Sequence, residues 1–165
     1  MSLSSKALAK PFMGNYWLLI AALPFLFAFS RPPFWSSSSV RHGLPFKPLF
    51  DATELQYDIP NNLLAKIGWR ESRFNPAIVE GRVISPKGAV GIMQILPDAH
   101  PTANPYNPHD AVPYAGKYLR SLFNKYGDWR LAVMAYNWGP GNVDNWRKNG
   151  GNIPAETQSY ISEVF

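Results

Sequence analysis

Short segments with the apolar spacing of helices, separated by Pro, Gly and Asn, fill the chain from Phe50 onward. One segment keeps its apolar residues on a single helix face over residues 112–126, and the next begins at Asp128, a suitable N-cap. These segments show neither a long alternating pattern typical of β-strands nor an internal repeat. The sequence therefore predicts a mainly α-helical domain.

The boundaries of the expected helices follow from the same spacing and from Pro and Gly positions. We expect helices at about residues 48–57 and 60–72, a short apolar helix stopped by Pro97, a helix over residues 112–126, another from Asp128 to the sequence AYNWGPG, and a last one starting near Pro154. Residues 75–89 contain NP, EG, SP and KG pairs, which predict a loop or a small hairpin.

Length, charge and cysteine content limit the class of protein. The chain has 165 residues, 46% of them hydrophobic, which suits one domain with an ordinary core. Its net charge of +5 comes from the first 50 residues, because the basic and acidic side chains after them are equal in number. The globular part therefore lacks the basic face that nucleic-acid binding needs. The absence of Cys excludes a disulfide framework, a thiol nucleophile and a Cys-based metal site.

Residues 1–30 have a different character from the rest of the chain. Two lysines precede the apolar run YWLLIAALPFLFAF, which is shorter than the ~20 residues that span a bilayer and is typical of a signal peptide. Residues 11–33 together are long enough for a tilted anchor. We expect residues 1–30 to meet a membrane, as an uncleaved anchor or a cleaved signal. Residues 31–48, which contain several Pro and Ser, predict a linker, and residues 49–165 the globular domain.

A carboxylate shares the apolar face of the helix expected at residues 60–72. The residues at positions i, i+3, i+4 and i+7 of this face are Leu64, Ile67, Gly68 and Glu71. Burial raises the pKa of a carboxyl group until it stays protonated near neutral pH, as a general acid for glycoside cleavage requires. The alternative is an ordinary surface glutamate at a helix end, paired with Arg70 or Arg73.

Two later segments place polar side chains beside apolar ones. GAVGIMQILP carries Gln94, whose amide suits a sugar hydroxyl or acetamido group and suits nearby backbone equally well. AYNWGPG ends a helix with Tyr136 and Asn137, while Gly139 and Gly141 stop that helix and allow close approach of the backbone.

Four segments in order, ESRFNP, SPKGAVGIMQILP, AYNWGPG and PAETQSY, resemble the motifs of the lytic transglycosylase family with the soluble lytic transglycosylase (SLT) catalytic domain. The resemblance covers about residues 50–165. It implies a lysozyme-like single domain of the goose type with a small loop or hairpin region. It also implies cleavage of the β-1,4 bond between N-acetylmuramic acid and N-acetylglucosamine in peptidoglycan, without added water and with a 1,6-anhydromuramic acid end.

The resemblance also implies roles for single residues. Glu71 corresponds to the lone acid/base, which protonates the leaving oxygen and then removes the proton of the muramic acid C6 hydroxyl. The implied substrate-binding residues are Ser85, Gln94, Tyr136, Asn137 and Glu156. Ser85 is the weaker assignment because the interval from Glu71 to Ser85 is longer than is usual in the family, and a helix-terminal amide that caps backbone explains Asn137 equally well.

Two other functions stay open beside the lyase. A hydrolytic muramidase of the same fold commonly needs a second carboxylate, for which Glu80 and Asp98 are candidates, although both are more simply solvated loop acids. A catalytically inactive glycan-binding assembly protein is the other alternative, and the presence of Glu71 and Gln94 argues against it.

The expected partners follow from the implied substrate. They are peptidoglycan strands, a membrane contacted through residues 1–30, and a phage, secretion or conjugation assembly, with a periplasmic, extracytoplasmic or virion-associated location. No cofactor is implied, and the three His lie too far apart in sequence for metal-ligand spacing.

The segment after LP reads DAHP, where a Thr-Ala pair is usual in the family, and it contains His100. His100 either faces the cleft or, as we favour, is a solvated loop residue.

Overall fold

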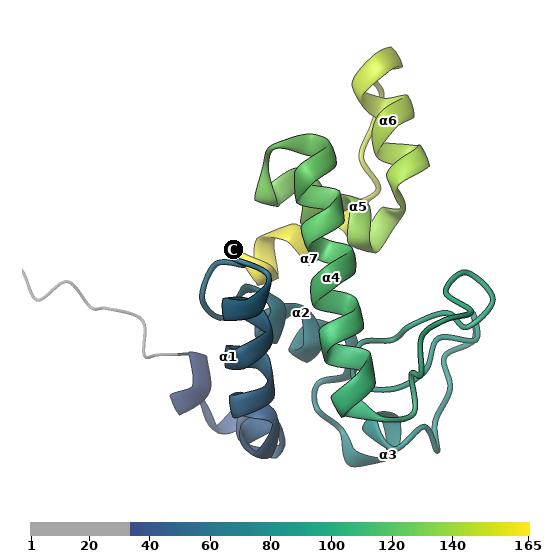
Figure 1. The fold of residues 1–165 in the computed structure, drawn as a ribbon. Helices are drawn as coiled ribbons and strands as arrows, with labels where there is room; N and C mark the ends of the chain where they lie inside the picture. The colour runs from purple at the N-terminus through teal and green to yellow at the C-terminus, as the bar shows by residue number, and fades with distance from the viewer. Residues whose placement is uncertain (1–33) are drawn as a thin grey trace, which may run out of the picture. The chain divides into compact units, whose positions relative to one another are not determined.

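Helices make up most of the computed structural model, which describes residues 34–165 (Figure 1). In chain order the elements are the 3-10 helices η1 (Phe34–Ser36) and η2 (Ser38–Phe46) and the α-helices α1 (Lys47–Gln56), α2 (Leu63–Ser72), α3 (Pro76–Val79), α4 (Pro108–Tyr126), α5 (Trp129–Trp138), α6 (Pro140–Asn149) and α7 (Ala155–Val164). Among these residues the only β-type pairing is an isolated antiparallel bridge between Val90 and Ile95. The prediction of a mainly helical domain is confirmed.

The membrane segment predicted for residues 1–30 lies outside the described residues. Within residues 34–165, no helix combines the length and the apolar character needed to cross a bilayer.

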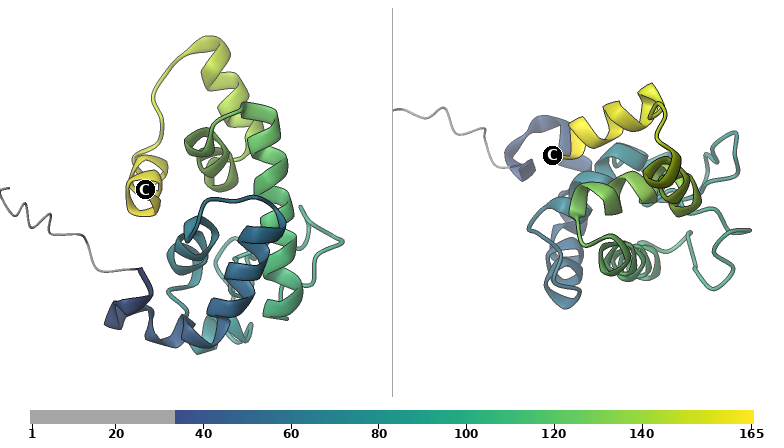
Figure 2. Two further views of the ribbon diagram at one scale, coloured as in Figure 1. Left: turned by 60° about the vertical axis from the view of Figure 1, so that its left-hand side comes forward. Right: turned by 90° about the horizontal axis from the view of Figure 1, so that it is seen from above.

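The long helix α4 and its neighbour α5 organise the core. α4 packs against α5 and α1, while α5 also packs against α6 and α7, and α2 lies between α1 and α7. α6 extends beyond the other helices in Figure 1 and in the left view of Figure 2. The expected spacing on α4 is confirmed, because Val112, Ala115 and Leu119 are buried on one face. Asp128 is the predicted N-cap of α5, since its carboxylate accepts a hydrogen bond from the backbone N–H of Leu131 at 2.9 Å.

A buried carboxylate on α1 fixes the start of α2. Glu54 is only 3% exposed and accepts hydrogen bonds from the backbone N–H groups of Asn62 (2.7 Å) and Ala65 (3.0 Å). It thereby satisfies N–H groups that a helix start leaves without intrahelical partners. α2 begins at Leu63 rather than at Pro60 as predicted, because Asn62 takes a left-handed conformation with φ of 63°. A contact across helices, invisible in the local sequence, therefore sets this boundary.

The short apolar helix expected before Pro97 is absent, and this prediction is wrong. Residues 90–95 instead form a tight turn closed by hydrogen bonds between Val90 and Ile95 in both directions. Gly91 has φ of 77° and Gln94 has φ of 45°, values that a right-handed helix excludes. A Cβ atom at Gly91 would collide with the carbonyl oxygen of Pro105, so this glycine lets the turn lie directly on a later loop.

Three other segments differ from the sequence expectations. The loop expected at residues 75–89 contains the single-turn helix α3, whose N-cap Asn75 accepts a hydrogen bond from the N–H of Ala77. Gly139 ends α5 as expected, but Pro140 then occupies the first turn of α6, which we did not predict. The segment expected to be a linker packs as η2 with Val40 buried, and the Trp35 ring stacks on Phe74 at 5.9 Å.

Candidate active site

Glu71 lies in the last turn of α2, where the helix meets α7. The preceding residues Leu64, Ile67 and Gly68 are buried, as the spacing predicted. At Gly68 a Cβ atom would stand 2.8 Å from the Phe50 ring, so glycine allows α2 to approach α1 closely. Glu71 itself is partly buried, and the Tyr160 hydroxyl of α7 donates a hydrogen bond of 2.5 Å to its Oε1.

The surroundings of Glu71 favour its neutral form. The net effect raises the pKa of Glu71 from 4.5 to about 7, and burial is its largest cause. The hydrogen bond from Tyr160 and the positive charge of Arg70 lower the pKa, and the negative charge of Glu156 raises it. At neutral pH a substantial share of Glu71 therefore carries a proton, as a general acid needs.

The arginines beside Glu71 pair with a different acid. Arg70 Nε lies 3.3 Å and Arg73 Nη2 lies 2.9 Å from Oε2 of Glu163, which belongs to α7. Lys66 adds a hydrogen bond from Nζ to the carbonyl oxygen of Val164 at 2.9 Å. These contacts tie α7 to α2, and they leave Glu71 without a partner for a salt bridge within residues 34–165. The surface pairing of Glu71 with Arg70 or Arg73, considered from the sequence, does not occur.

Tyr160 is the site residue that the sequence analysis missed. It is only 2% exposed, and its hydroxyl is the sole side-chain hydrogen-bond partner of Glu71 among the described residues. Glu156 and Tyr160 are four residues apart and share one face of α7, so the carboxylate and the tyrosine approach α2 together. That spacing was the available signal, since it places Tyr160 on the same helix face as the candidate residue Glu156.

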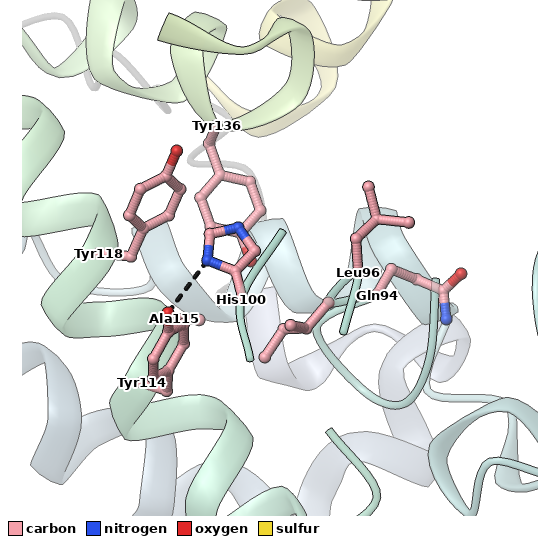
Figure 3. Close-up of a pocket in the computed structure, with 8 residues that line it drawn as sticks. Gln94, Leu96, His100, Tyr114, Ala115, Tyr118 and Tyr136 are labelled. Atoms are coloured by element: carbon pink, nitrogen blue, oxygen red, sulfur yellow. Dashed lines mark hydrogen bonds between the residues drawn. The ribbon is translucent and has the colours of Figure 1, made fainter. Parts of the chain in front are cut away.

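Tyr136 and Gln94 line one pocket, and Tyr136 is close enough to Glu71 to respond to its charge. The Tyr136 hydroxyl, on α5, donates a hydrogen bond to the carbonyl oxygen of Met93 at 3.3 Å. Burial, together with the negative charge of Glu71, raises the pKa of Tyr136 well above its usual value. Gln94 and Tyr136 line the same pocket, but the Gln94 amide nitrogen donates back to the carbonyl oxygen of Gly91 at 3.1 Å. Figure 3 shows the amide of Gln94 turned away from the aromatic side chains of this pocket.

The remaining candidate residues are less closely connected with Glu71. Ser85 Oγ accepts a hydrogen bond from the N–H of Ala89 at 2.9 Å within its own turn, and no hydrogen bond joins Ser85 to Glu71 in the described residues. Asn137 follows Tyr136 on α5, is partly buried, and makes no side-chain hydrogen bond within residues 34–165. Glu156 is exposed at the start of α7 and acts on Glu71 through its charge.

The acids that sequence reasoning offered for water activation lie on the surface. Glu80 forms an ion pair with Arg82 at 2.7 Å, and both side chains are more than half exposed. Asp98 is exposed as well. Residues 34–165 contain no group of three or more His, Asp or Glu side chains arranged to hold a metal ion. The arrangement around Glu71 is therefore that of a proton donor and acceptor with two charged neighbours, Arg70 and Glu156.

The chain is similar in sequence to known transglycosylases. Soluble lytic murein transglycosylases of Salmonella typhimurium and Escherichia coli are each 29% identical over 156 residues, which cover 79% of this chain and 23% of the relative. The transglycosylase of Enterobacteria phage PRD1 is 30% identical over 117 residues, covering 69% of this chain and 42% of the phage protein. The chain thus spans less than half the length of these relatives. No solved structure matches it at a significant level.

The family profile described as the Transglycosylase SLT domain matches residues 48–158. This match begins one residue after the start of α1 and includes α2, the turn at residues 90–95, α5 and the first part of α7. It therefore contains the elements that carry Glu71, Gln94, Tyr136 and Glu156. The chain belongs to the Transglycosylase SLT domain family.

Proposed function

We propose that the protein is a peptidoglycan lytic transglycosylase that uses Glu71 as its single acid and base. Protonated Glu71 donates its proton to the glycosidic oxygen between N-acetylmuramic acid and N-acetylglucosamine as the C1–O4 bond breaks. The resulting carboxylate accepts the proton of the muramic acid C6 hydroxyl, whose oxygen forms a bond to C1. The products are a free 4-hydroxyl and a 1,6-anhydro end, and no water is consumed.

One observation carries this proposal: the carboxyl group of Glu71 is partly buried, has no salt-bridge partner within residues 34–165, and has a pKa near 7. The two protonation states are then of similar free energy, so one group can act as acid and as base in successive steps. Intramolecular attack by the C6 hydroxyl requires no second catalytic carboxylate, because the nucleophile is already part of the substrate. This agrees with the surface positions of Glu80 and Asp98.

The substrate, location and partners are proposed from the relatives. Two of them are named murein transglycosylases, which supports murein strands as the substrate and action outside the cytoplasm. A third relative is a phage transglycosylase, which supports a role in a machine that opens the wall locally. We place Gln94, Tyr136 and Glu156 along the bound glycan, with Asn137 and Ser85 as further contacts and residues 1–30 at a membrane.

Hydrolysis by the same fold is the second candidate, and the nearby charge of Glu156 is the observation that favours it. The test is mass spectrometry of muropeptides after digestion of purified peptidoglycan by the full-length protein. Anhydromuramic acid ends are expected, whereas reducing muramic acid ends would identify a hydrolase, and intact glycan would refute both enzymes. Glu71→Gln should abolish product formation, and the exposed Glu80→Gln is the matched control. Full activity of Glu71→Gln would refute the assignment of the acid.

A further inference from the structure

His100 is held in a cluster of aromatic side chains rather than in solvent. Its Nδ1 lies 3.0 Å from the hydroxyl oxygen of Tyr114, one turn away from Tyr118 on α4. The imidazole packs edge-on against both rings, with centroid distances of 5.6 Å to Tyr114 and 4.9 Å to Tyr118. Figure 3 shows this cluster beside Tyr136. His100 lies in a loop as expected, but its ring packs against these aromatic side chains and is partly buried, so the expectation of a freely solvated ring is wrong.

The cluster forms one wall of a small pocket next to the candidate active site. The pocket has a volume of about 80 Å³, and Tyr136, which also lines it, is close enough to Glu71 to respond to its charge. Ile95, Leu96 and Ala115 give it an apolar lining. A shallow groove of about 490 Å³ along α4 shares Tyr114 and Tyr118 with this pocket, so the two cavities adjoin.

Hydrogen-bonding capacity in the pocket remains unused by the protein. Within residues 34–165 no group bonds to Nε2 of His100, whose other ring nitrogen is engaged by Tyr114. Burial lowers the pKa of His100, so the imidazole is neutral near pH 7 and carries one N–H and one lone pair. Because the Tyr114 hydroxyl either donates to Nδ1 or accepts from it, Nε2 is available in the complementary role. The Tyr118 hydroxyl also lacks a protein partner in the described residues.

We propose that this pocket binds the acetamido group of an N-acetylated sugar, with His100 Nε2 as the hydrogen-bonding group and Tyr114 as the residue that orients it. An acetamido group has an apolar methyl, which matches the Ile95, Leu96 and Ala115 lining, and an amide, which matches Nε2. The adjoining groove along Tyr114 and Tyr118 then takes the sugar ring that carries the group, since aromatic faces stack well on the apolar faces of sugars.

This inference rests on the proposed function, because it assumes that the glycan passes Glu71. It adds a specificity-determining residue at the position where the sequence departs from the family pattern Thr-Ala. It also separates the role of His100 from that of Gln94, whose amide nitrogen is occupied by Gly91 and turned away from the pocket.

The experiment measures glycan binding in the full-length Glu71→Gln protein, so that turnover does not interfere. The probes are the β-1,4-linked tetramer of N-acetylglucosamine and the same tetramer without acetyl groups, titrated by tryptophan fluorescence. We expect His100→Ala to weaken binding of the acetylated tetramer by about fivefold, the loss of one neutral hydrogen bond, and to leave the weaker binding of the deacetylated tetramer unchanged. His109→Ala is the matched control, because His109 is an exposed histidine at the start of α4.

A second readout does not depend on removing the side chain. In the protein with ¹⁵N-labelled histidine, the acetylated tetramer should shift the Nε2 resonance of His100 and leave that of His109 in place. Tyr114→Phe should also reduce the affinity for the acetylated tetramer, as His100→Ala does, because the imidazole loses its fixed orientation.

Equal affinity of the His100→Ala and His109→Ala proteins for the acetylated tetramer, with no shift at Nε2, would overturn this inference alone. Failure of the Glu71→Gln protein to bind either tetramer would also overturn it, whereas the product analysis decides the proposed function separately.

Discussion

Replacing the proposed catalytic acid by its amide should stabilise the protein in alkaline solution. The folded state holds the Glu71 proton up to about pH 7, whereas an unfolded chain releases it near 4.5. Because the folded pKa is the higher one, the stabilisation from this carboxyl group is complete below pH 4.5 and is lost as the pH rises toward 7. The amide of Glu71→Gln does not titrate, so the variant avoids this loss.

The magnitude follows from the two pKa values. With 4.5 in the unfolded state and about 7 in the folded state, proton linkage makes the wild type lose about 2.5 kcal/mol between pH 5 and pH 8 through this group. The stability advantage of Glu71→Gln over the wild type should therefore be about 2.5 kcal/mol larger at pH 8 than at pH 5. Titrating groups that do not interact with Glu71 contribute equally to both proteins and cancel in this comparison.

The assay is urea unfolding of the full-length proteins, followed by tryptophan fluorescence at both pH values. Glu80→Gln provides the control, since it changes an exposed carboxyl group, and its stability difference from the wild type should be the same at both pH values. If the advantage of Glu71→Gln changed by less than about 0.5 kcal/mol between pH 5 and pH 8, the raised pKa and the argument for a neutral acid would be refuted.

Three further predictions concern the neighbours of this site. Tyr160→Phe removes a hydrogen bond that lowers the pKa of Glu71, so the alkaline limb of the pH–activity profile should move to higher pH. An alkaline limb that stays in place or moves to lower pH would contradict this prediction. Glu54→Ala leaves two N–H groups at the start of α2 without their acceptor, so urea titrations should show a loss of about 2–4 kcal/mol in the free energy of unfolding. The control Glu80→Ala changes an exposed side chain and should lower this free energy by less than about 0.5 kcal/mol. Gly91→Ala should lower the free energy of unfolding by more than about 2 kcal/mol, because its Cβ atom would collide with the Pro105 carbonyl oxygen. Gly88→Ala is the control, since Gly88 also has a positive φ but has open space around it, and an equal loss of stability in both variants would contradict the collision.

Helices with regular apolar stripes were predictable because their pattern is local. The spacing over residues 112–126 predicted the core of α4, and Asp128 predicted the start of α5 through a hydrogen bond three residues away. The shared face of Leu64 and Glu71 likewise indicated a carboxylate in an apolar setting. In each case the residues that determine the structure lie within a few turns of one another.

The remaining features depend on residues that are distant in sequence. The turn at Gly91 requires contact with Pro105, and the apolar composition of that segment favours a helix just as well. The Arg70 and Arg73 side chains pair with Glu163, and Tyr160, which is 89 residues from Glu71, supplies the hydrogen bond to the acid. Spacing within α2 contains no information about partners on α7, so the surface pairing of Glu71 could not be excluded from the sequence.

The dependence of Glu71 on α7 has a consequence for the newly made protein. α2 leaves the ribosome more than eighty residues before α7, and Tyr160, Glu163 and the burial of the Glu71 carboxyl become complete only when α7 docks. We expect Glu71 to remain an ordinary ionised glutamate until then. If the proposed function holds, the protein would thus gain its activity only at the end of folding, and a partly folded chain would not cleave glycan.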